Sequence, residues 1–178
     1  MPNKEKITKR KEKTSKIEPQ IRERFFNAIK NNDFEKVKNI VESEVLIIDA
    51  NCINNALIVV LKKENWEMVK YLIDKGADAN TEYEYNYNKS KTALIIASEK
   101  ENLEMVKYLV EHGADVNAKN KSGKTALIMA SEKGNLEIVK YLVEHSASDI
   151  NFALLNAAIN ENLEMVKYLV ESGADVDV

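Results

Sequence analysis

The 178-residue sequence has little cysteine, histidine, glycine or proline. Cys52 is its one cysteine and cannot form an internal disulfide, and with His112 and His145 it supplies too few ligands for a structural zinc site. The scarcity of glycine and proline argues against a many-turned β fold and favours helices. No apolar run approaches the roughly 18 residues of a membrane span, and no secretory signal is visible. We therefore expect a helical protein without metal, cofactor or membrane span, located inside the cell and most simply in the cytoplasm.

Charge is distributed unevenly along the chain. Residues 1–18 carry a net charge of +4, whereas residues 19–178 carry −7. The first segment lacks apolar periodicity, so we expect a disordered basic tail that keeps the protein in solution. Its short basic string at 9–13 leaves open a nuclear-import signal or a contact with an acidic surface.

One eight-residue string recurs along the chain. It reads LEMVKYLV at 103–110 and at 163–170, and LEIVKYLV at 136–143. Earlier copies read WEMVKYLI at 66–73 and, more divergent, FEKVKNIV at 34–41. Successive copies start about 33 residues apart, with four residues inserted before the third copy and six deleted before the fifth. A period of this length indicates a repeat protein.

Each repeat is expected to form a pair of helices. Gly113 follows the recurring string and suits a left-handed helix terminator, while Thr125 can cap a second, shorter helix that begins after it. The segment 113–123 between them is rich in Gly, Asn and Asp, which predicts a turn. A lone helix pair cannot cover its apolar faces, so the repeats must stack. Within the string, the stripe expected to be buried consists of Leu103, Val106, Leu109 and Val110.

The repeats resemble the ankyrin repeat. The resemblance rests on Gly123-Lys124-Thr125-Ala126-Leu127 with Ala130, on Gly134-Asn135-Leu136-Glu137-Ile138-Val139, and on Gly113-Ala114-Asp115-Val116-Asn117-Ala118, and it covers residues 20–178. It implies an all-α solenoid of helix pairs joined by β-turn fingers. It also implies a protein without catalysis that binds another macromolecule on its fingers and inner helices. Approximate repeat boundaries follow from the period: 19–50, 51–83, 84–120, 121–148 and 149–178.

Several positions depart from the pattern of that family. Asn55 and Phe152 stand where a capping Thr is expected, and Asn can still cap a helix whereas Phe cannot. Before the fifth repeat the finger is missing, and Ser146 replaces the terminating Gly. A residue other than Gly in the left-handed region costs on the order of 1 kcal/mol, so this joint is expected to be softer or differently angled than its neighbours.

The extended finger before the third repeat holds three alternating tyrosines, Tyr83, Tyr85 and Tyr87. Tyrosine is enriched at interface anchors, and lysines of the next finger add positive charge beside it, which would suit an acidic protein or peptide. The rings could instead pack on the neighbouring finger and only stiffen it. The partner-binding residues that we predict are Tyr83, Tyr85, Tyr87, Lys89, Lys91, Glu99, Lys100, Lys119, Lys121, Ser122, Lys124, Glu132 and Lys133.

Other single residues of note have structural explanations in the repeat. His112 and His145 sit one repeat apart at equivalent helix ends, and Cys52 lies in an apolar-leaning stretch where burial is expected. Asn80 and Asn117 match the turn asparagine of the family, which ties down the finger. An enzyme is therefore not expected.

Two other functional classes and one structural feature remain open. The basic tail and the finger lysines could contact nucleic acid, but a net charge of −7 on residues 19–178 argues against a phosphate-tracking groove. A strong excess of Lys over Arg hints at an A/T-rich genome, which is compatible with a host-directed effector of an intracellular bacterium or virus. The string at 163–170 has the sequence of an internal repeat and not of a polar cap. We therefore expect that residues continue beyond 178, or that this end self-associates or is weakly ordered.

Overall fold

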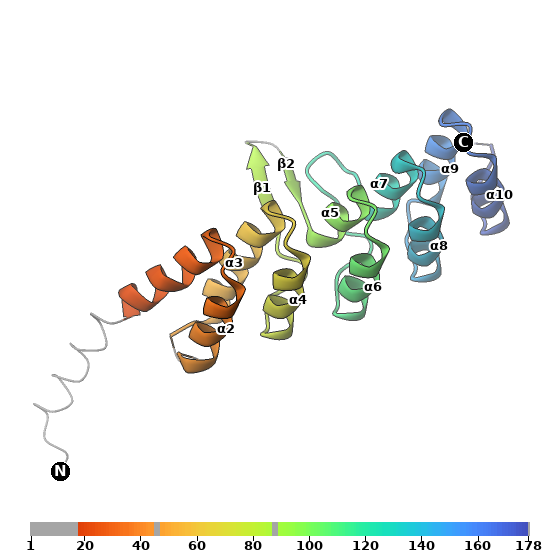
Figure 1. Cartoon of the computed structure of the whole chain (residues 1–178). Coiled ribbons are helices and arrows are strands. Elements are labelled where there is room, and N and C mark those ends of the chain that lie inside the picture. The colour runs from red at the N-terminus through yellow and green to blue at the C-terminus, as the bar shows by residue number, and fades with distance from the viewer. Residues whose placement is uncertain (1–17, 45–46, 87–88, 178) are drawn as a thin grey trace, which may run out of the picture. The chain divides into compact units, whose positions relative to one another are not determined.

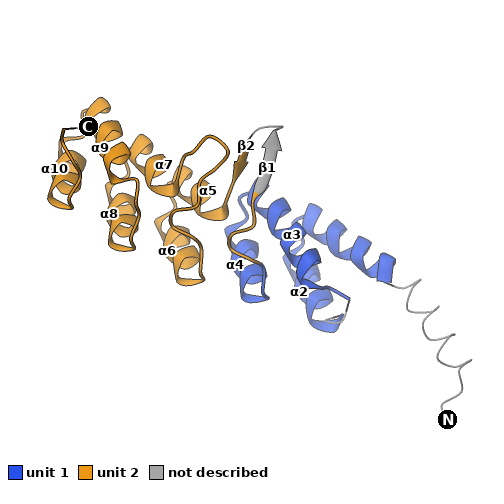
Figure 2. Cartoon of the chain, turned by 180° about the vertical axis from the view of Figure 1, so that it is seen from behind, with its two compact units in different colours: residues 1–77 blue, residues 78–178 orange. Residues whose placement is uncertain are grey.

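The computed structural model describes residues 18–44, 47–86 and 89–177, and within the hairpin of residues 83–91 it describes the side chains of residues 90 and 91 only. Residues 1–17 of the predicted disordered tail and Tyr87 lie outside the described residues, whereas Glu18, the last residue of that tail, is helical. The described chain is mostly helical, which confirms the predicted fold class. It divides into two compact units, residues 1–77 and residues 78–178 (Figure 2).

The described residues of compact unit 1 form two helix pairs. The first helix is described over residues 18–30, and α2 (Phe34–Ser43), α3 (Ala50–Lys62) and α4 (Trp66–Asp74) follow (Figure 1). Side-chain contacts join the two pairs: the Phe34 and Tyr71 rings meet edge to face at 5.4 Å, and the Asn65 side chain donates to that of Asn32. The core of this unit is apolar and includes Phe25, Ile29, Leu57, Leu61, Met68 and Leu72.

Compact unit 2 contains a β-hairpin and three helix pairs. The inner helices α5, α7 and α9 pack side by side, and the outer helices α6, α8 and α10 each pack on the inner helix that precedes them. The bounds of the elements are β1 (Tyr83–Asn86), β2 (Lys89–Lys91), α5 (Ala93–Glu99), α6 (Leu103–Glu111), α7 (Ala126–Lys133), α8 (Leu136–Glu144), α9 (Ile150–Ile159) and α10 (Leu163–Glu171) (Figure 1).

Polar side chains cap the helices of compact unit 2. Thr92 and Thr125 accept the N–H groups of Ile95 and Ile128, which confirms the predicted caps of the inner helices α5 and α7. The outer helices use asparagine, whose side-chain oxygen accepts the N–H three residues later at 3.0–3.1 Å. These capping residues are Asn102, Asn135 and Asn162.

Two inner helices begin earlier than the repeat pattern predicts. Asn55 lies inside α3, which starts at Ala50, and Phe152 lies inside α9, which starts at Ile150, so neither residue is at a cap. In α3 the cap is Asp49, which accepts the N–H of Cys52 at 2.9 Å. Without a capping Thr at the aligned position, the helical backbone continues toward its N-terminus until it reaches an Asp.

The buried stripe of the outer helix is also shifted from the prediction. Met105, Val106 and Leu109 are buried in α6, whereas Leu103 and Val110 are only half-buried. Leu103 is the first residue of its helix, and part of its side chain is exposed to solvent there. Trp66, which occupies the equivalent position in α4, is likewise half-buried.

The turn before the shortened repeat keeps the left-handed geometry without glycine. Gly113 adopts φ +85° after α6, and Ser146 adopts φ +69° at the equivalent place after α8. Only five residues separate α8 from α9, which agrees with the missing finger. The inserted finger, in contrast, forms the antiparallel β1–β2 hairpin, whose register shifts between Glu84 and Asn86.

Candidate functional site

The finger at residues 115–124 is shaped by one side chain. Asn120 Oδ1 accepts the N–H groups of Ser122 and Lys124, both at 2.9 Å, and the Asn120 N–H donates to the Lys124 carbonyl at 3.0 Å. Gly123 completes the turn with φ +77°, a conformation that favours glycine. These local bonds hold the backbone of the finger that carries its lysines.

The finger and the inner helices α7 and α9 enclose a groove of about 370 Å³, which we name the finger groove. Four residues predicted from sequence line it: Lys119, Ser122, Lys124 and Glu132. Its other lining residues, which the sequence did not single out as binding residues, are Gly123, Ile128, Asp149, Phe152 and Asn156. The deletion before the fifth repeat could have indicated these residues, because without a finger the start of α9 follows α8 closely.

Opposite charges pair inside the finger groove. Lys124 Nζ lies 2.7 Å from Glu132 Oε1, and Lys119 Nζ lies 3.4 Å from Asp149 Oδ1. The second carboxylate oxygen of Asp149 is buried, and within the described part of the chain no group donates a hydrogen bond to it. Asp149 also makes no side-chain cap bond to α9. Its carboxylate is therefore directed to the lysine of the finger instead of the helix terminus.

The remaining predicted residues lie outside this groove. Lys91 pairs with Glu99, which repeats the Lys124–Glu132 contact one repeat earlier. Lys100, Lys121 and Lys133 are exposed and do not line the finger groove. Tyr83, Tyr85 and Lys89 belong to the hairpin strands, but their side chains are outside the described structure. Their part in binding stays a prediction.

Asparagines tie successive turns of compact unit 2 together. Asn80 Nδ2 donates to the Gly113 carbonyl at 3.0 Å, and its Oδ1 accepts the Asp115 N–H at 2.7 Å. Asn117 makes the equivalent contacts with Ser146 and Ser148 in the next repeat. These bonds confirm the tethering role predicted for both asparagines. They fix the base of the finger that borders the groove.

The histidines and the cysteine have structural surroundings. His112 Nδ1 lies 2.7 Å from the Tyr108 carbonyl oxygen and its ring stacks on that tyrosine, and His145 repeats this arrangement with Tyr141. Cys52 is buried, and burial raises the pKa of its thiol above the usual range. The described residues contain no group of three or more His, Cys, Asp or Glu side chains that could hold a metal ion.

The comparison with protein families agrees with this arrangement of repeats. The family model described as ankyrin repeats (3 copies) matches residues 25–120 and 113–178. A comparison with curated proteins finds no match. None of the helices in the described ranges has the length and apolar character needed to cross a bilayer. The match spans most of the sequence, and the chain therefore belongs to the ankyrin repeat family.

Proposed function

We propose that this chain binds another protein through the finger groove. Ankyrin repeats are generally protein–protein interaction modules, and the family is typically non-catalytic. The observation that carries the proposal is the meeting of four sequence-predicted residues in one groove with an exposed aromatic ring. Phe152 lines this groove while 61% of its surface is exposed.

The finger groove has the composition of a small interface. Interfaces place most of their binding energy in a few apolar or aromatic anchors, with polar groups around them. Phe152 and Ile128 supply the apolar floor, and the Lys124–Glu132 and Lys119–Asp149 pairs form its border. A partner side chain that covers Phe152 would remove apolar surface from water without separating these charges.

The border also favours a particular charge on the partner. Lys119 is 54% exposed at its side chain, and Lys121 is exposed on the same finger. An acidic group next to the apolar anchor of the partner would approach these lysines from the solvent side. We therefore propose a partner segment that combines an apolar side chain with a neighbouring Asp or Glu. Charges at the border of an interface act mainly on the association rate.

Photo-crosslinking from defined positions tests the groove. A photoreactive amino acid replaces Ser122, which is exposed and lines the finger groove, and a matched one replaces Glu137 on the outer helix α8, where the side chain is 69% exposed. We expect a specific protein adduct from position 122 that is absent from position 137. Adducts from position 137 alone, or equal adducts from both, would contradict binding through the groove.

The alternatives give different results in the same assay. If the chain is a host-directed effector, the protein crosslinked at position 122 will come from host extract and not from the source cell. Nucleic-acid binding would instead appear as an affinity for generic DNA or RNA that falls steeply with salt. The paired lysines of the groove argue for the protein partner, since each already has a carboxylate beside it.

A further inference from the structure

Exposed apolar surface is concentrated in the last helix pair. Among the described residues, every large hydrophobic side chain with high exposure belongs to α9, α10 or the segment after α10. A concentration of exposed apolar side chains is a feature of interaction sites. These residues are Phe152, Leu155, Ile159, Leu163, Val170 and Val176.

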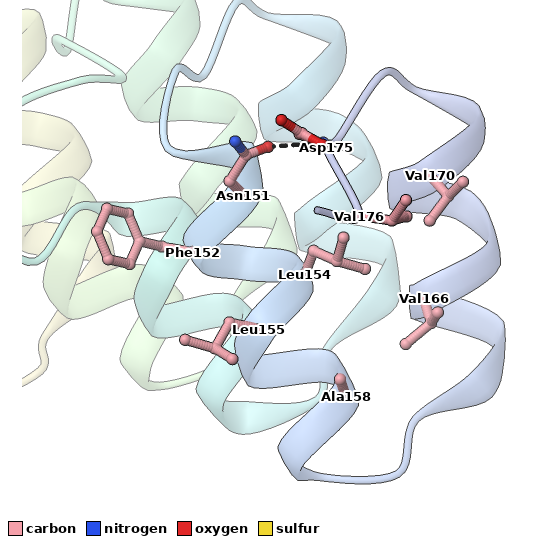
Figure 3. A pocket seen from close by; sticks show the side chains of 9 residues that line it. All are labelled: Asn151, Phe152, Leu154, Leu155, Ala158, Val166, Val170, Asp175 and Val176. Atoms are coloured by element: carbon pink, nitrogen blue, oxygen red, sulfur yellow. Dashed lines mark hydrogen bonds between the residues drawn. The ribbon is translucent and has the colours of Figure 1, made fainter. Parts of the chain in front are cut away.

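Part of this surface forms a second groove of about 370 Å³, the end groove, between α9, α10 and residues 175–176 (Figure 3). Leu154 and Ala158 face Val166 and Val170 across it. Its polar edge is already satisfied, because the Asp175 N–H donates to Asn151 Oδ1 at 2.9 Å. The remaining lining residues are Leu155, Val176 and Phe152, which borders both grooves.

The same positions are buried one repeat earlier. Val139 in α8 and Leu127 in α7 are fully buried, whereas their counterparts Val166 and Leu154 are only half-buried. In the earlier repeat the next inner helix, α9, packs against α7. The end groove is therefore lined by residues at the same repeat positions as those that pack between repeats earlier in the chain. An apolar element that fills it would continue the stacking of repeats in compact unit 2.

The charge pattern of α9 is compatible with a second copy of the chain as the occupant. None of the ten residues of α9 is charged, whereas α5 carries Glu99 and α7 carries Glu132 and Lys133. In a two-fold interface each residue near the axis meets its own copy, so a charge there would face the same charge. Among the inner helices of compact unit 2, α9 alone can face itself without such repulsion.

We propose that a second copy of this chain covers the end groove, so that two molecules associate through their α9 helices across a two-fold axis. Leu155 and Ala158 lie at the centre of the contact, and Val166 and Val170 of each molecule border it. The contact is isologous, which closes the assembly at two copies. The finger of residues 115–124 takes no part in it.

Sedimentation equilibrium over a range of concentrations measures this association for the full chain. We expect the wild type to form dimers and Leu155→Lys to raise the dissociation constant at least about 30-fold, as for loss of an interface anchor. Leu155 is 53% exposed, so the fold should tolerate the change, and circular dichroism checks this. The matched control is Leu163→Lys, which alters a leucine of α10 that is 65% exposed and does not line the end groove, so this change should leave the dimer intact.

A charge-swap experiment tests the two-fold axis itself. Leu155→Lys and Leu155→Glu should each be monomeric alone, and their equimolar mixture should recover dimers, because the opposite charges meet across the axis. A wild type that stays monomeric at about 100 μM would overturn the proposal. A Leu163→Lys variant that dissociates as completely as Leu155→Lys would overturn it too. A mixture that fails to dimerise would overturn the two-fold arrangement.

Discussion

The side chain of Asn117 is hydrogen-bonded to Ser148 at both the backbone and the hydroxyl. Asn117 Oδ1 accepts the Ser148 N–H at 2.8 Å and the Ser148 hydroxyl at 2.9 Å, while its Nδ2 donates to the Ser146 carbonyl at 3.1 Å. These bonds span about 30 residues of sequence and join the finger at 115–124 to the turn after α8. This asparagine therefore helps to connect two repeats where the intervening finger is missing.

Loss of this tether should destabilise the protein. Asn117→Ala removes three hydrogen bonds, each worth about 0.5–1.5 kcal/mol net, so we expect the free energy of unfolding to fall by about 2 kcal/mol. Urea denaturation followed by circular dichroism measures it. The control is Asn39→Ala on the exposed face of α2, where a better helix former should change stability by less than about 0.5 kcal/mol. Equal losses in both variants would contradict the tether.

The left-handed turn after α8 predicts a stabilising substitution. Ser146 adopts φ +69°, so Ser146→Gly should relieve backbone strain and raise the free energy of unfolding by about 0.5–1 kcal/mol. The reciprocal change, Gly113→Ser at φ +85°, should lower it by a similar amount. Apart from its two chain neighbours, no described residue has an atom within 4 Å of a Cβ placed at position 113, so that cost is one of backbone conformation and not of crowding. Thermal unfolding of both variants checks the opposite signs.

The Lys124–Glu132 pair should matter more for binding than for folding. Its side chains are 43% and 31% exposed, and pairs of this exposure contribute about 0–1 kcal/mol to stability. A double-mutant cycle with Lys124→Ala and Glu132→Ala should therefore give a small coupling in urea denaturation. Binding to the protein crosslinked at position 122 should weaken measurably in Lys124→Ala. A variant that unfolds outright would show that the pair is needed for the fold.

Asp49 predicts a pH dependence of stability. The Cys52 N–H bond, with a smaller effect of Arg22, lowers the pKa of the Asp49 carboxyl below its usual range. Its contribution is thus present above the usual Asp pKa and is lost as pH falls through the lowered value. In Asp49→Asn, which keeps a capping oxygen without the charge, stability should fall less between pH 7 and pH 3 than in wild type. Parallel urea titrations at both pH values measure the difference, and identical losses would contradict it.

The hairpin tyrosines give a prediction about affinity. If Tyr83, Tyr85 and Tyr87 anchor the partner, replacing all three with Ala should weaken binding by at least about 2 kcal/mol. Stability should change little, because the hairpin lies outside the helix pairs. Titration calorimetry with the crosslinked partner and a melting curve separate the two effects. Unchanged affinity, or a lower melting temperature, would show that the rings serve the fold.

The sequence by itself determined the repeats and their helices. The recurring string located every outer helix from α2 to α10, because its apolar residues are spaced to lie on one face of a helix and an Asp or Asn precedes each copy. Thr92, Thr125 and Gly113 marked helix ends in the same way. These features depend on residues a few positions apart, so they can be read along the chain.

Only the tertiary structure decided which residues share a groove and which face is left open. Helices α3 and α9 begin earlier than the repeat pattern predicts, directly after Asp49 and Asp149. The carboxylate of Asp149 thereby lies beside Lys119, which is 30 residues away in sequence. Val166 and Val139 occupy equivalent positions in the repeat, yet one is half-buried and the other fully buried. Burial and ion pairing depend on the neighbours that stacking brings together. Because the repeats share one sequence pattern, that pattern cannot specify which neighbour each copy meets.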